Sequence, residues 1–216
     1  MKSLINKIIL TSLITLGINN SYSQNSKFSE DSKLLIYGEP HHVSILTKEF
    51  VINSIDSLKK EGYNYFAIEL DRGEYNPVQS YLKSDKKYRD SEWDSSASTE
   101  KLLEMIYNFY KKGYKVIPID TNVFSEWEFI GDSILNRREF HMAEKLEEIT
   151  KKDSSAKIVA FVGGIHAIKS GEGSIAVLLK KRGINSETIY LMDNKLTNQK
   201  DRLIAEYFDK IIYLNK

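Results

Sequence analysis

Short apolar runs alternate along the chain with longer stretches of helical periodicity, and this alternation most constrains the fold. Strands that alternate with helices predict an α/β fold with a mostly parallel central sheet. The runs are apolar throughout, as expected of strands that helices cover on both faces. The predicted strands cover residues 34–37, 65–68, 116–119, 158–162, 188–191 and 211–214.

The stretches between these runs carry apolar residues at helical spacing. The predicted helices cover residues 43–60, 98–110, 135–151, 175–181 and 200–207, the second of them capped by Ser98 or Thr99. Residues 72–96 lack a clear period. We expect them to form a long, lid-like insertion with one helical turn near Val78–Leu82. No linker divides residues 24–216, which are predicted to form a single domain.

The first 23 residues differ from the rest of the chain. Lys2 and Lys7 precede an uncharged apolar run over residues 8–18, and Ser21 and Ser23 are small residues near its end. This pattern predicts a secretory signal peptide that is cleaved after Ser23, since the run is too short for a stable membrane anchor. The sequence therefore predicts an exported protein, periplasmic or secreted, that keeps no membrane anchor after cleavage.

Composition excludes several classes of protein. Lys and Arg number 31 against 30 Asp and Glu, so the formal net charge of +1 does not favour a nucleic-acid partner. The absence of Cys excludes disulfides, a thiol nucleophile and a zinc finger. The sequence also lacks the Gly-x-Ser-x-Gly elbow, the Walker loop and the His-Glu-x-x-His motif. The expected partner is a small-molecule or peptide substrate.

Acidic residues and histidines collect where the predicted strands end. Ligands of open α/β sheets bind beyond the carboxyl ends of the strands, so these side chains are candidates for one shared site. Histidine is the usual general base near neutral pH, and carboxylates beside it can orient it, share a proton or bind a metal. The candidates are Glu39, His41, His42, Glu69, Asp71, Asp120 and His166.

Several of these candidates have a plainer interpretation. His42 fits an exposed surface residue, Asp120 fits a turn, and Asp71 fits a turn with a surface ion pair. These three are secondary candidates. The fourth histidine, His141, falls within a predicted helix and is expected to be exposed or packed there.

Four motifs follow one another in a recognisable order: Gly38-Glu39-Pro40-His41, Gly62-Tyr63 with Glu69, Arg138-Glu139-Phe140-His141-Met142-Ala143-Glu144, and Gly163-Gly164-Ile165-His166-Ala167. Their order and spacing resemble the erythromycin esterase and ChaN-like group of the Tiki/TraB superfamily. The sequence departs from the family pattern at His42, where many relatives have Gly, and at Glu139, where Asp is usual.

The resemblance implies an α/β domain with a site at one end of the sheet, formed by Glu39, His41, Glu69, Arg138 and His166. It also implies mixed activities, which include lactone hydrolysis, metal-dependent proteolysis and haem binding. In some esterase-type members the equivalent of His41 would be His42.

The leading hypothesis is an exported hydrolase that activates water against an ester, lactone or amide bond. In it His41 deprotonates the water, and Glu39 or Glu69 orients the imidazolium. Arg138 stabilises the oxyanion, while His166 acts as the acid or as a second base. A metal-dependent variant would use Glu39, His41, Glu69 and His166 as ligands for Mn²⁺ or Zn²⁺. The alternatives are a haem- or metal-binding protein without catalysis and a degenerate member with a structural role.

Overall fold

Six strands form one sheet in which every neighbouring pair runs parallel. The computed structural model describes residues 32–40, 43–84, 96–121, 131–170, 173–196 and 199–215. The strands are β1 (Leu34–Glu39), β2 (Tyr65–Ile68), β3 (Lys115–Pro118), β4 (Ile158–Gly163), β5 (Ser186–Asp193) and β6 (Lys210–Leu214). Their order across the sheet is β3-β2-β4-β1-β5-β6. This confirms the predicted α/β fold, with a sheet that is entirely parallel.

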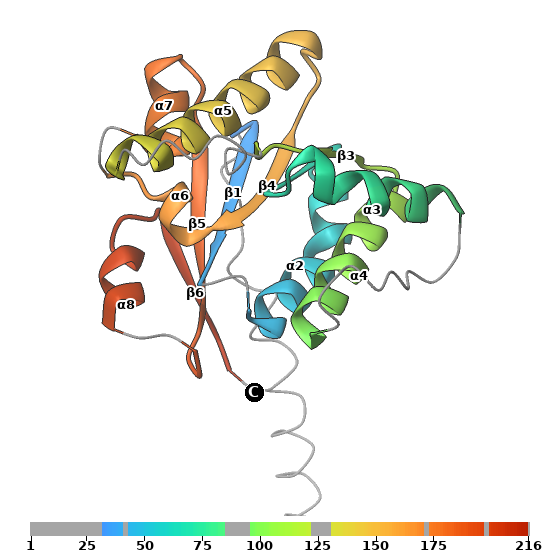
Figure 1. Ribbon diagram of the computed structural model, residues 1–216, viewed down its shortest axis with the longest axis horizontal. Coiled ribbons are helices and arrows are strands. Elements are labelled where there is room, and N and C mark those ends of the chain that lie inside the picture. The colour runs from blue at the N-terminus through green and yellow to red at the C-terminus, as the bar shows by residue number, and fades with distance from the viewer. Residues whose placement is uncertain are drawn as a thin grey trace, which may run out of the picture. The chain divides into compact units, whose positions relative to one another are not determined.

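Helices cover both faces of this sheet, as predicted (Figure 1). In the described ranges the helices are α2 (Ile45–Lys60), α3 (Arg72–Ser84), α4 (Ala97–Lys111), α5 (Gly131–Lys152), α6 (Gly164–Ala167), α7 (Ile175–Lys181) and α8 (Gln199–Ala205). Helices α2 and α4 pack together on one face, while α5 and α7 pack together on the other. None of the described helices is long and apolar enough to cross a membrane.

Alternation along the strands assigns each side chain to one of the two faces. Leu34 and Ile36 of β1 are fully buried in the core cluster beneath α5 and α7. Tyr37 points the other way, and its ring meets the edge of Phe50 of α2 at 6.1 Å. On the same side, Phe66 of β2 stacks on Phe109 of α4 with ring centroids 3.8 Å apart. Both faces are therefore apolar core, and the polar side chains are left to the strand ends.

The free edge of β3 is protected from pairing with another strand. Pro118 has no backbone N–H to offer to a neighbouring strand. The carbonyl of Val116 accepts a hydrogen bond of 3.0 Å from the hydroxyl of Tyr75 in α3. A proline and a covering helix are two common means of blocking an edge strand.

The helical content of residues 72–96 is the largest error of the sequence prediction, because α3 is a helix of 13 residues rather than one turn. Its start is set by reciprocal hydrogen bonds: the Glu74 backbone N–H donates to Asp71 Oδ1 at 2.9 Å, and the Asp71 N–H donates to Glu74 Oε2 at 3.1 Å. This is a capping box. Tyr75, Val78 and Leu82 supply the buried stripe that holds the helix.

Two other helix starts also differ from expectation. The cap of α4 is Ser96, whose hydroxyl accepts from the Thr99 N–H at 3.2 Å, rather than Ser98 or Thr99. The short helix α6, which follows β4 directly, was not predicted. Its first residue must be glycine, because a Cβ on Gly164 would lie 2.5 Å from the ring of Tyr190. Gly164 therefore permits β4 and α6 to pack closely against Tyr190 of β5.

Some expectations fall on residues outside the described ranges. These are the signal peptide over residues 1–23, both His41 and His42, and residues 85–95 of the insertion. The described part of the chain belongs to one compact unit, Ser32–Lys216.

Candidate functional site

Polar side chains line the carboxyl end of the sheet, where ligands of parallel sheets bind. Across the sheet they are Asp120 after β3, Glu69 after β2, His166 after β4, Glu39 at the end of β1 and Asp193 at the end of β5. Among the described residues, these polar side chains and their partners form two buried networks, one on each face of the sheet.

The first network, called here the His166 cluster, consists of Glu69, Asp120, Arg138, Glu139 and His166. Glu69 is its centre. One carboxylate oxygen, Oε1, accepts from Arg138 Nη2 at 2.8 Å and lies 3.3 Å from His166 Nε2. The other, Oε2, accepts from the backbone N–H of Gly163 at 2.6 Å. Because all these donors hold one carboxylate, Glu69 serves to position two cationic side chains at the end of the sheet.

Arg138 projects from α5 and joins Glu69 to Asp120. Its Nε and Nη2 donate to the two Asp120 oxygens at 3.1 and 2.5 Å, the fork geometry that an arginine offers a carboxylate. Burial opposes the charge, but the hydrogen bonds and charges of Asp120 and Glu69 outweigh it and raise the pKa of Arg138 above its usual range. Within the described ranges, Nη1 has no hydrogen-bond partner. Arg138 thus keeps one N–H group that could bind an added ligand.

His166 lies between two carboxylates. Its Nδ1 is 2.9 Å from Glu139 Oε1, while its Nε2 makes the longer 3.3 Å contact with Glu69. Burial of the ring lowers its pKa, but the hydrogen bonds and charges of Glu139 and Glu69 outweigh burial and raise the pKa of His166 to about 9. The ring is therefore protonated at neutral pH. This suits the role of acid and does not suit the role of second base.

Glu139 is a site residue that the sequence analysis missed. Its side chain is 7% exposed, and its second oxygen, Oε2, is buried without a hydrogen-bond partner among the described residues. The signal was its position, because Glu139 falls on the same helical stripe as the buried Met142 and Leu146. A charged residue on an apolar stripe needs a partner inside the protein, and His166 is that partner.

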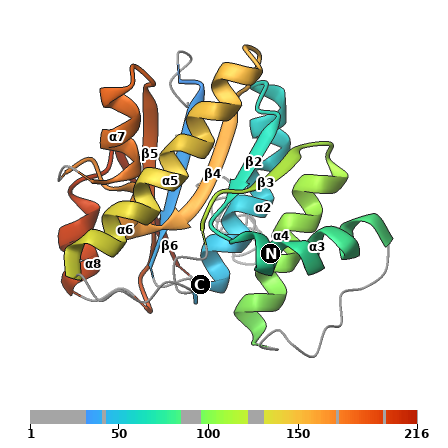
Figure 2. The same cartoon turned by 45° about the horizontal axis from the view of Figure 1, so that its top comes forward.

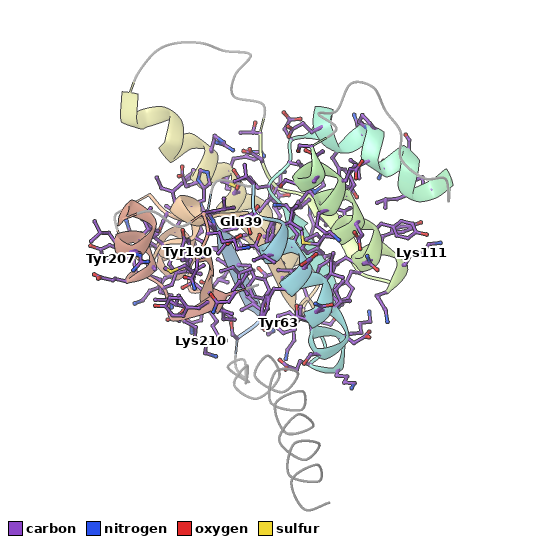
Figure 3. The ribbon with its side chains drawn as sticks, turned by 90° about the horizontal axis from the view of Figure 1, so that it is seen from below. Glu39, Tyr63, Lys111, Tyr190, Tyr207 and Lys210 are labelled. Carbon is purple, nitrogen blue, oxygen red and sulfur yellow. The ribbon has the colours of Figure 1, made fainter. Side chains whose placement is uncertain are left out.

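The second network, called here the Lys48 cluster, consists of Glu39, Ser44, Thr47, Lys48 and Asp193 on the α2 face. Glu39 lies deep among the side chains next to α2 (Figure 3). Both of its oxygens accept from Lys48 Nζ at 3.1 Å, and Oε2 also accepts from Thr47 Oγ1 at 2.5 Å. Ser44, which caps α2, donates to Asp193 Oδ2 at 2.7 Å.

Lys48 is the second residue that the sequence analysis missed. The exposed fractions of the Lys48 and Glu39 side chains are 1% and 0%. Burial lowers the pKa of Lys48, and the charge and hydrogen bonds of Glu39 oppose that shift. The signal was again positional: Lys48 continues the buried stripe of Val51, Ile55 and Leu58 on α2.

The sequence predicted that Glu39 and Glu69 belong to one shared site. The described contacts instead place their carboxylates against helices on opposite faces, with Glu39 beside α2 and Glu69 beside α5. Asp120 joins the His166 cluster, whereas Asp71 caps α3 and has a local structural role. His141 lines a groove that also includes Asp120.

The donor chemistry of the described residues does not fit a metal centre. Both ring nitrogens of His166 already contact carboxylates, with Nδ1 at 2.9 Å from Glu139 and Nε2 at 3.3 Å from Glu69. Both oxygens of Glu39 are bound by Lys48. The described ranges contain no group of three or more His, Asp or Glu residues that could hold a metal ion. The Mn²⁺ or Zn²⁺ site expected from sequence stays a prediction that depends on His41.

The raised pKa of His166 predicts that stability falls with rising pH. The folded-state pKa of about 9 exceeds the ordinary 6.5, so the imidazolium stabilises the fold fully below pH 6.5 and loses that effect toward pH 9. The shift corresponds to about 3 kcal/mol of unfolding free energy. Urea unfolding across this range should show the decline in the parent protein but not in a His166→Asn variant. A His141→Asn variant should keep the decline, and a flat profile in the parent would contradict the assignment.

Comparisons with known proteins show the fold. No protein-family profile and no curated protein matches the sequence. Among solved structures, the type III effector HopBA1 matches with a TM-score of 0.61 and 15% identity, over 85% of this chain and 88% of that one. A mutant of the erythromycin esterase EreC in its open conformation matches with a TM-score of 0.54 and 9% identity, over 75% of this chain and 70% of that one.

A third similar structure is the haem complex of ChaN of Campylobacter jejuni. Its TM-score is 0.46 at 11% identity, over 76% of this chain and 82% of that one, which is too weak to support an argument. The chain therefore shares its fold with HopBA1 and with an erythromycin esterase, at identities that show the fold alone.

Proposed function

We propose that the chain is a hydrolase that activates water against an ester, lactone or amide bond. The observation that carries the proposal is the pairing of two cations at one strand end. His166 and Arg138 share Glu69 Oε1, and both side chains are largely buried. A protonated imidazole and a guanidinium can both donate hydrogen bonds to an oxygen that gains negative charge during acyl transfer. The shared fold with an esterase agrees with this chemistry.

The residues divide the reaction among them. His41, two residues after Glu39 in the sequence, takes a proton from water as the resulting hydroxide adds to the carbonyl carbon. The electron pair of the C=O bond moves to oxygen, and Arg138 Nη1 donates to this oxyanion. The oxyanion then re-forms the C=O bond as the bond from carbon to the leaving oxygen or nitrogen breaks. His166 Nε2, which makes the longer of its two contacts, gives its proton to that leaving atom.

The two buried networks position these groups. Glu139 and Glu69 fix the ring of His166, and Asp120 fixes the guanidinium of Arg138. The His166 cluster contains three carboxylates and two cations. One of these carboxylate oxygens, Glu139 Oε2, has no hydrogen-bond partner among the described residues and is a further acceptor near His166. Lys48 holds the Glu39 carboxylate in a single orientation. We further propose, from residues 1–23, that the protein acts after export.

Replacing Arg138 with glutamine should lower the hydrolysis rate by about 100- to 1000-fold, the usual effect of losing an oxyanion donor. Initial rates on a panel of p-nitrophenyl esters, lactones and peptide amides would measure it. The matched control is Arg182→Gln. Arg182 follows α7 and pairs with Glu147, which lies elsewhere on α5 than Arg138. Equal losses in both variants would show that Arg138 acts through stability alone.

Elemental analysis and an absorbance spectrum of protein purified without chelator test the cofactor alternatives. A stoichiometric amount of Mn or Zn that is lost in His41→Ala would support the metal-dependent variant and direct the screen toward peptide bonds. A Soret band with no hydrolysis of any substrate on the panel would contradict the proposed function and favour haem binding.

A further inference from the structure

In Figure 2, β3 lies between α5 on one side and α3 on the other. Residues of these three elements line a groove along the free edge of β3. Its volume is about 1100 Å³, at or above the upper end of the range for small-ligand pockets. One of its lining residues is Asp120, which also binds Arg138 of the His166 cluster. Asp120 is therefore shared by the groove and the candidate site.

The groove has polar walls above an apolar floor. On the α3 side, Asn76 and Gln79 lie one helical turn apart, and both are exposed. On the α5 side, His141, Lys145, Glu148 and Lys152 follow one another at the same spacing. Val116, Ile117, Pro118 and Ile149 form the apolar part of the lining. Such a surface offers hydrogen-bond donors and acceptors to both sides of a long, narrow ligand.

Charge and aromatic contacts narrow the class of that ligand. The lining carries two lysines against Asp120 and Glu148, so it has no charge excess that would select a polyanion. A saccharide usually stacks on an open aromatic face. Lys115 Nζ, however, lies 4.7 Å from the centroid of the Tyr65 ring, and Tyr75 is 7% exposed. Neither tyrosine of the lining offers a free face.

A polypeptide backbone matches this polar lining without a charge excess, since the backbone presents amide donors and acceptors at regular spacing and carries no net charge. The wall from His141 to Lys152 rises about 16 Å along the axis of α5. An extended chain advances about 3.3 Å per residue, so about five residues fit along this wall. Pairing with the edge of β3 itself is blocked by Pro118 and by the Tyr75 hydroxyl on Val116. The side chains of the two walls must therefore hold the ligand.

We infer that the groove between α3 and α5 binds an extended polypeptide segment and leads it to the His166 cluster. Cleavage of that segment rests on the proposed function, but its binding does not. The peptide amide thereby becomes the favoured bond among those that the candidate site could hydrolyse.

Binding of fluorescein-labelled, dephosphorylated β-casein, followed by anisotropy with the full chain, tests the inference. Saturable binding is expected. Gln79→Trp and Glu148→Trp should each weaken it by about 10-fold or more, because the indole occupies space that the ligand needs. The matched controls are Ser80→Trp on α3 and Glu144→Trp on α5, which are exposed neighbours outside the groove and should bind casein like the parent.

The inference would be overturned if casein shows no saturable binding, or if the groove and control variants weaken casein binding equally. It would also be overturned if the protein binds chitohexaose saturably but not casein, and Gln79→Trp abolishes the chitohexaose binding. Hydrolysis of p-nitrophenyl esters by the parent protein is measured in parallel. Ester hydrolysis without groove-dependent casein binding would remove this inference and leave the proposed function. Groove-dependent casein binding without hydrolysis of any substrate would leave this inference and remove the proposed function.

Discussion

Replacing His41 with alanine is expected to lower the hydrolysis rate by between about 100- and 10,000-fold, the contribution of a positioned general base. The expectation rests on the position of His41 two residues after Glu39, whose carboxylate the structure holds rigidly at the end of β1. Without the imidazole, water must attack without transfer of its proton to a base. Initial rates on the best substrate of the ester, lactone and amide panel measure the loss.

The adjacent His42 provides the matched control. His42→Ala should hydrolyse the same substrate within a few-fold of the parent rate. If His42→Ala loses activity and His41→Ala does not, the base is His42. Parent-like hydrolysis by both variants would contradict water activation by either histidine. Thermal unfolding of each variant separates loss of chemistry from loss of fold.

Replacing Lys48 with methionine is expected to lower the free energy of unfolding by about 3–5 kcal/mol, because it leaves the fully buried Glu39 carboxylate without its cation. This is a large share of the stability of a single domain, which is typically about 5–15 kcal/mol. Methionine has nearly the length of the lysine stem, so the loss reports the charge rather than a cavity. Urea unfolding at pH 7 measures it.

Two further variants make this measurement specific. Lys60→Met, at the exposed end of the same helix, should change stability by about 0.5 kcal/mol or less. The double variant Lys48→Met with Glu39→Gln removes both charges and should recover much of the loss. A Lys48→Met variant as stable as the Lys60→Met control would contradict the buried ion pair.

The two networks show where sequence reasoning reaches its limit. Glu69, Asp120, Arg138 and His166 could be proposed from sequence because each follows a strand or matches a motif. Lys48 could not be, because in sequence it resembles an ordinary charged residue of an amphipathic helix, and the motif that contains Glu139 does not indicate that its side chain is buried. Only their place on the buried stripes of α5 and α2 distinguished them, and that signal does not name a partner.

The helix α3 illustrates a different kind of failure. Its capping box, Asp71 with Glu74, and its buried stripe of Tyr75, Val78 and Leu82 were all present in the sequence. The lack of a clear period over residues 72–96 nevertheless favoured an irregular segment. The buried contacts of this stripe compensate for the backbone hydrogen bond that Pro77 removes, and such compensation is visible only in the tertiary structure.

The sequence by itself determined the strands, most of the helices, the parallel sheet and the strand ends at which a site would form. These follow from local periodicity and from the need to bury apolar faces, which are properties of short stretches of chain. Only the tertiary structure decided that Glu39 faces Lys48, that Glu69 and Glu139 enclose His166, and that a groove leads to Asp120. Pairing of buried charges depends on which faces meet in space, and residues as distant in sequence as Glu69 and His166 meet only when the sheet has formed.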